Sequence, residues 1–151
     1  MLQAEAFMKE ALREAEKDGN EVPVGAVVVH EGKIIARAHN ERESGRPFAH
    51  AEMLAMERAC RALNTRRLHG CTLYVTLEPC PMCAGALLMA EIDGCVFGAY
   101  DPRQGCCGSV YTLPQDPAFF HRVNCAGGVM EEACSRLLRR FFQEKRSASP
   151  V

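Results

Sequence analysis

Two short segments constrain the fold of this chain most, because their side chains make one metal site only if folding brings the segments together. The first is His50-Ala51-Glu52, and the second, further along the chain, is Pro79-Cys80-Pro81-Met82-Cys83. One imidazole and two thiolates suit zinc, and zinc with three protein ligands keeps a fourth tetrahedral position for water, as in catalytic sites. The carboxylate two residues after the histidine can then move protons of that water. The two segments therefore predict a zinc site with its own acid and base.

Both segments fall where the sequence predicts the start of a helix. Apolar residues recur at helical spacing over 49–63 and over 82–90. A helix N-terminus carries partial positive charge, which favours thiolates and other anions. Residues at i and i+2 lie about 200° apart on a regular helix, so His50 and Glu52 reach one metal only if it lies over the helix end. We therefore expect two helix ends to face one metal ion.

The rest of the pattern is that of an α/β protein. Helical spacing also occurs over 2–17 and 130–145. Glu31-Gly32 is a plausible tight turn, so the strands on either side form a hairpin whose first strand is central. Because strands alternate with helices, we predict a mixed sheet with helices on both faces. The predicted strands are 24–30, 33–38, 72–77, 95–99 and 123–126.

Length, composition and charge exclude several classes of protein. The chain has 151 residues, 48% of them hydrophobic, so one domain can bury a core without needing disulfides. Its first residues lack the pattern of a signal peptide, and no apolar run approaches the ~20 residues of a membrane span. The nine cysteines are therefore expected to be mostly reduced thiols of a cytoplasmic protein. With a net charge of -1, binding to nucleic acid requires a local basic patch.

Each part of the metal motif also has a plainer interpretation. Cys-x-x-Cys in a cytosolic protein is a redox motif as well, and cysteines are often simple core residues. A fourth cysteine, Cys95, Cys106 or Cys107, could close the metal shell and make the zinc structural. Glu52 alone is typical of a solvated carboxylate at a helix N-terminus. The combination favours a catalytic site, because a closed site has no use for a carboxylate beside the histidine.

A wider similarity lies in segments 21–29, 49–52, 73–86, 97–101, 105–109 and 141–142. These segments resemble the bacterial tRNA-specific adenosine deaminase family. The Pro-Cys-x-x-Cys and His-x-Glu motifs are common to the cytidine-deaminase-like superfamily, so they indicate the chemistry rather than the substrate. The resemblance implies a three-layer α/β/α sandwich with a central mixed five-stranded sheet, one zinc ion per subunit and a homodimer. It also implies conversion of adenosine to inosine at the wobble position (34) of a tRNA anticodon.

The resemblance implies a role for each residue of the metal motif. His50, Cys80 and Cys83 would hold zinc, which would lower the pKa of water so that hydroxide attacks C6 of adenine. Glu52 would be the catalytic residue that takes a proton from water, delivers it to N1 and later helps ammonia to leave.

Three further positions match substrate-binding residues of the family. Asn40 would orient the flipped base, although an asparagine after a strand is also a common turn residue. Ala51 is the second of these substrate-binding positions. Asp101 would lie near the RNA sugar, where a carboxylate can accept a hydrogen bond from a 2′-hydroxyl. Alone, an aspartate before Pro102 is read as turn chemistry.

The last predicted helix offers the local basic patch that tRNA binding requires. Its best candidates for contacts with phosphates are Lys145 and Arg146. The plainer interpretation is a solvated helix face with two phenylalanines docked into the core. The other residues concerned are Arg136, Arg139, Arg140, Phe141 and Phe142.

Two residues depart from the family pattern and bear on substrate shape. Phe48 stands where threonine is common, and Phe120 replaces a frequent asparagine. Two other functions therefore stay open. One is deamination of a free nucleobase or nucleoside, of guanine or cytosine type, and the other is that of a non-catalytic zinc-binding module. In each case we expect one zinc domain over residues 1–146 and a frayed tail over 147–151.

Overall fold

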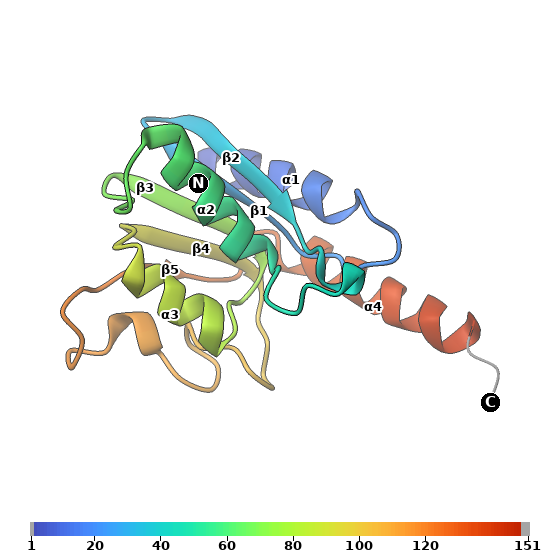
Figure 1. Ribbon diagram of the computed structural model, residues 1–151. Helices are drawn as coiled ribbons and strands as arrows, with labels where there is room; N and C mark the ends of the chain where they lie inside the picture. The colour runs from blue at the N-terminus through green and yellow to red at the C-terminus, as the bar shows by residue number, and fades with distance from the viewer. Residues whose placement is uncertain (1, 149–151) are drawn as a thin grey trace.

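The computed structural model describes residues 2–148 and contains one mixed five-stranded sheet (Figure 1). The strand order is β2-β1-β3-β4-β5. β1 pairs antiparallel with β2 and β3, whereas β3, β4 and β5 are parallel. The prediction of a hairpin whose first strand is flanked on both sides is confirmed. The bounds are Gly25–His30 for β1, Lys33–His39 for β2, Cys71–Leu77 for β3, Gly94–Ala99 for β4 and Asn124–Ala126 for β5.

Helices cover both faces of the sheet, which confirms the predicted α/β/α layers. α2 (Ala51–Leu63) and α3 (Pro81–Met89) lie on one face (Figure 1). α1 (Leu2–Ala15) and the first part of α4 (Glu131–Ala148) pack on the other. β1 therefore has a core on each side, and its run Ala26–Val29 is buried throughout, as expected for a covered strand.

The helix ends differ from the predicted ones by a few residues, and one difference has a clear cause. α2 begins at Ala51 because His50 is its N-cap, with an extended backbone and a carbonyl that accepts the first helical hydrogen bond. α4 continues to Ala148, past the predicted start of a tail at 147, and projects beyond the sheet (Figure 1). Residues 149–151 of that tail lie outside the described part of the chain. No helix within residues 2–148 is long and apolar enough to cross a membrane.

The strand directions collect polar residues at one end of the sheet. β2, β3 and β4 run in the same direction, because β1 is antiparallel to both of its neighbours. Their carboxyl ends therefore share one edge. Asn40 follows β2, the segment from Glu78 to Cys80 follows β3, and Asp101 follows β4 closely. This edge holds the candidate site.

Candidate active site

One ring nitrogen and two sulfur atoms meet at this edge. The Nδ1 atom of His50 lies 3.7 Å from Sγ of Cys80 and 3.5 Å from Sγ of Cys83. All three side chains offer ligand atoms within 4.8 Å of one another. With Zn–N near 2.1 Å and Zn–S near 2.3 Å, tetrahedral zinc holds nitrogen and sulfur ligands about 3.6 Å apart. The three residues therefore fit zinc, with Nδ1 as the histidine ligand.

Two helix starts place these side chains. His50 and Cys80 are the N-cap residues of α2 and α3, and Pro81 stands at the start of α3. His50 lies outside the helix while Glu52 lies in its first turn, so the helical spacing that would separate them does not apply. The predicted meeting of two helix ends is confirmed.

A hydrogen bond between the two cysteines governs their protonation. It lowers the pKa of the Cys80 thiol to about 4 and raises the pKa of Cys83. The pKa of His50 is raised, chiefly by its hydrogen bond with Cys80. Metal ligands bind as thiolates and neutral imidazole, so zinc must displace the proton that Cys83 holds and compete with protonation of His50. Metal binding here is therefore coupled to proton release.

Glu52 is buried beside these ligands rather than solvated. It is 4% exposed and lines the same cleft as His50 and Cys80. Burial raises the pKa of its carboxyl group to about 7. A group with this pKa can both accept and donate a proton near neutral pH. The alternative of a solvated first-turn carboxylate is therefore wrong.

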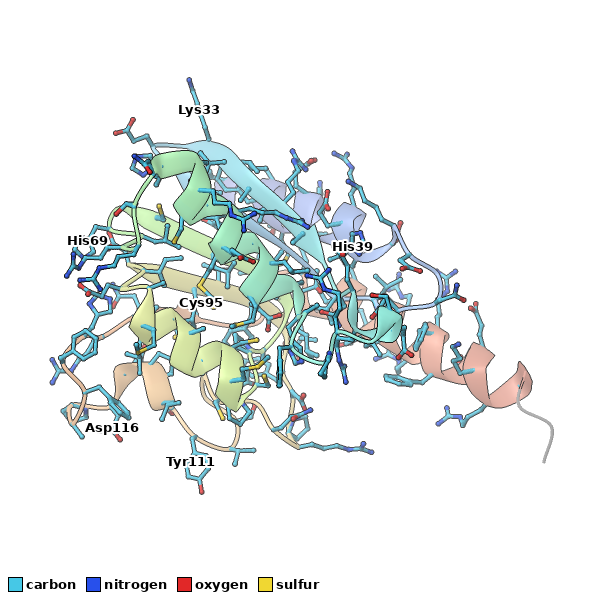
Figure 2. The ribbon with its side chains drawn as sticks, in the orientation of Figure 1. Lys33, His39, His69, Cys95, Tyr111 and Asp116 are labelled. Atoms are coloured by element: carbon cyan, nitrogen blue, oxygen red, sulfur yellow. The ribbon has the colours of Figure 1, made fainter. Side chains whose placement is uncertain are left out.

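A fourth cysteine does not close the metal shell. Within residues 2–148, the only His, Cys, Asp and Glu side chains that come close enough to hold a metal ion are the three described above. Cys95 is buried on β4 (Figure 2), where it shares a hydrogen bond with Cys107. Cys106 donates to the carbonyl of Gln104. The alternative of a closed structural site is therefore wrong.

The metal ligands open into a cleft of about 1090 Å³. We call five buried or half-buried polar residues of its lining the floor: Asn40, His50, Glu52, Glu78 and Cys80. The exposed lining is the rim, to which basic side chains and two aromatic rings contribute. These rim residues are Arg42, Tyr100, Arg103, Arg139, Phe142, Lys145 and Arg146.

Asn40 and Ala51 are linked to each other in the floor. Asn40 is 4% exposed, and its Oδ1 atom accepts the N–H of Ala51 at 2.8 Å. The Nδ2 amide makes no hydrogen bond within residues 2–148 and is not sealed from solvent. Asn40 is thus fixed through its oxygen with its donors available to the cleft. Ala51 is fully buried, with its N–H already used, and it does not line the cleft.

Asp101 lines the cleft and also performs the turn chemistry that its position suggests. Its Oδ1 atom accepts the N–H groups of Arg103 at 3.0 Å and Gln104 at 3.4 Å. Its own N–H donates to Glu78 at 3.0 Å. Asp101 therefore lies in the cleft lining, and its carboxylate has a structural task there; its contact with the RNA sugar stays a prediction.

The rim contains the predicted cations and two that sequence reasoning missed. Lys145 and Arg146 line the cleft from α4, and Phe142 is 46% exposed beside them rather than docked in the core. The missed cations are Arg42 and Arg103. They lie in loops after β2 and β4, and only the shared direction of those strands brings them to α4.

The two residues that depart from the family pattern lie away from this cleft. Phe48 and Phe120 are 69% and 73% exposed, and both line an apolar cavity of about 1090 Å³ over α2 and α3. Neither lines the cleft that contains Glu52. Their effect on substrate shape therefore stays a prediction.

The fold and the site define a zinc-dependent deaminase. Residues 1–99 match the family model described as the cytidine and deoxycytidylate deaminase zinc-binding region. This is a family of hydrolytic enzymes, so the alternative of a non-catalytic zinc-binding module does not hold.

Similarity to individual proteins shows which family of zinc-dependent deaminases this chain belongs to. A tRNA-specific adenosine deaminase of Bacillus subtilis (strain 168) is 54% identical over 149 residues, covering 97% of this chain and 92% of the relative. A solved structure from work on A-to-I editing by tRNA:A34 deaminases has a TM-score of 0.84 and 42% identity, covering 88% of this chain and 99% of that chain. For a guanine deaminase from Nitrosomonas europaea the TM-score is 0.78 and the identity 26%, with coverage of 91% and 83%. The chain belongs to the tRNA-specific adenosine deaminase family.

Proposed function

We propose that this protein hydrolyses adenosine to inosine and ammonia at wobble position 34 of a tRNA anticodon, in the cytoplasm. The observation that carries the proposal is the cleft itself, where a buried carboxylate and three zinc ligands lie beneath a basic and aromatic rim. A free base would occupy only the floor. The rim suits a longer substrate, because guanidinium and ammonium groups bind phosphates and aromatic rings stack on unpaired bases.

The floor residues can carry out the proton transfers of the reaction. Bound by His50, Cys80 and Cys83, zinc supplies Lewis-acid chemistry that makes water a nucleophile near neutral pH. Glu52 takes the proton that this water loses and delivers it to N1 of adenine, which prepares C6 for attack. Glu52 would then take the proton of the hydroxyl group added at C6 and transfer it to the amino group, which leaves as ammonia. Its pKa of about 7 suits both directions of transfer.

Asn40 and the rim would orient the substrate. The Nδ2 amide of Asn40 can donate a hydrogen bond to an acceptor on the flipped base, because its oxygen is already held by Ala51. Asp101 keeps one carboxylate oxygen for a ribose hydroxyl, since the hydrogen bonds of its turn use Oδ1. Lys145 and Arg146 would bind backbone phosphates.

We also propose that two copies associate through the apolar cavity over α2 and α3. Four large hydrophobic side chains are exposed there, and contiguous apolar surface of this kind marks a protein contact. The second copy is the occupant that the family resemblance implies. Met89→Lys should shift the protein from dimer to monomer in light scattering, and an unchanged mass would contradict this interface. The four residues are Phe48, Met89, Phe119 and Phe120.

A paired assay tests the substrate. The protein is incubated with an anticodon stem-loop that has adenosine at position 34, and in parallel with free guanine, cytosine and adenosine. We expect inosine in the stem-loop and no ammonia from the free compounds. Ammonia from guanine or cytosine with unchanged RNA would replace the tRNA proposal by the free-base alternative.

A further inference from the structure

A second buried carboxylate, which the proposed chemistry does not use, lies next to the metal ligands. Glu78 is 2% exposed and precedes the Pro79-Cys80 segment directly. Its side chain accepts hydrogen bonds from three backbone N–H groups and one hydroxyl, all from one loop. The donors are the N–H of Asp101 at 3.0 Å, of Cys107 at 3.1 Å and of Ser109 at 2.9 Å, and the Ser109 hydroxyl.

The loop packs so closely on the Glu78 side chain that one of its positions requires glycine. Gly105 passes over the carboxylate so tightly that a Cβ atom there would overlap the Glu78 side chain. The loop is also held by the main chain, because the N–H of Cys106 donates to the carbonyl of Pro79 at 2.9 Å. The Gly105–Ser109 motif therefore serves to seat the loop on the residues just before Cys80.

The same loop carries part of the cleft lining. Asp101, Arg103 and Gln104 line the cleft. The Glu78 carboxylate holds this loop at Asp101 itself and again at Ser109, so Arg103, Gln104 and Gly105 lie between two fixed points. A carboxylate suits this position because it has only acceptors to offer the four donors. A glutamine would place an NH₂ donor against at least one N–H.

We propose that Glu78 is a positioning residue that holds the 101–109 loop in register with the metal site and thereby sets the affinity for the RNA substrate. This inference rests on the proposed function, because it takes Asp101 and Arg103 to face the substrate. Both oxygens of the Glu78 carboxylate already accept hydrogen bonds from the loop. Its loss should therefore act through the loop, on binding more than on turnover.

Kinetics with the anticodon stem-loop test the proposal in the zinc-loaded, full-length protein. Glu78→Gln should raise KM about tenfold with a smaller change in kcat, as expected when one strong hydrogen bond that supports binding is lost. Zinc content should stay at one ion per chain. Glu14→Gln, which alters a buried carboxylate on α1, is the matched control and should leave KM unchanged.

A double-mutant cycle separates positioning from general destabilisation. In the Glu78→Gln background, Arg103→Ala should raise KM less than it does alone, because the released loop no longer presents Arg103. Lys145→Ala, on α4, should show its full effect in both backgrounds. Additive effects for both pairs would overturn the proposal.

Limited proteolysis provides a readout that does not depend on the substrate. Trypsin should cut after Arg103 about tenfold faster in Glu78→Gln than in the wild type, with cleavage after Arg122 as the internal reference. If Glu78→Gln does not fold, Ser109→Ala should show a smaller effect of the same kind. Ser109→Thr keeps the hydroxyl group and should behave like the wild type. A wild type that leaves the stem-loop unchanged contradicts the proposed function. Unchanged KM and unchanged cleavage at Arg103 in a folded Glu78→Gln or Ser109→Ala variant contradict the role of Glu78.

Discussion

The floor and the rim of the cleft are built in opposite ways. In the floor, Glu52 is buried, Asn40 is held by the main chain of Ala51, and the metal ligands contact one another. The rim consists of exposed side chains on two loops and on α4, a helix that projects beyond the sheet. Bond-making groups need fixed geometry, whereas attraction of phosphates needs only charge in the right region. Substitutions should therefore have large, specific effects in the floor and small, salt-dependent ones in the rim.

The largest effect is expected at Glu52. Glu52→Ala should lower kcat for the stem-loop by about 10²–10⁴-fold, the usual contribution of a positioned acid and base. Zinc content should not change, because Glu52 is not one of the three ligands. Inosine formation and metal analysis on the same preparation measure both. Activity within a few-fold of the wild type would remove Glu52 from the mechanism.

The next prediction concerns the stability of the folded protein, and it tests the buried floor residue Glu52 without any substrate. The pKa of Glu52 is about 7 in the folded protein and 4.5 ordinarily, so between these values the unfolded chain has released a proton that the folded one keeps. Stability therefore falls as pH rises through this window, by up to about 3 kcal/mol. In chelator-treated protein, Glu52→Gln should be more stable than wild type at pH 8 and nearly equal at pH 4.5 in urea unfolding. An equal difference at both pH values would contradict the raised pKa.

The difference between floor and rim also explains what the sequence could predict. The zinc ligands and Glu52 stand at fixed spacings beside two helix starts, so local pattern was enough to find them. Arg42 and Arg103 stand in separate loops, and they meet only because β1 is antiparallel to both of its neighbours.

Two other outcomes depended on side-chain packing that a sequence does not specify. Glu78 stood inside a recognised motif, but its four donors come from a loop more than twenty residues away along the chain. Phe48 lies two residues before a metal ligand, yet its side chain points to the apolar cavity and not to the cleft. A position close in sequence to a functional residue therefore did not predict which cavity the side chain lines.

Asn40 allows the structural and substrate-binding tasks of one floor residue to be separated. Asn40→Asp keeps an oxygen for the Ala51 N–H but loses the amide donors, so it should keep the melting temperature and lose about tenfold or more in kcat/KM. Asn40→Ala also leaves the buried N–H unpaired, which should lower stability by about 1–3 kcal/mol. Equal activity of Asn40→Asp and wild type would assign the residue to structure alone.

The smallest effects are expected on the rim. Lys145→Ala should raise KM for the stem-loop a few-fold, leave kcat and zinc content unchanged, and reduce the slope of log affinity against log salt by about one. Lys33→Ala is the matched control, because it removes the same charge at the other end of the sheet (Figure 2). If the two variants behave alike, the net charge of the protein and not the rim attracts the RNA. If instead Lys145→Ala lowers kcat as strongly as Glu52→Ala does, α4 takes part in fixing the reacting base, and the division between floor and rim fails.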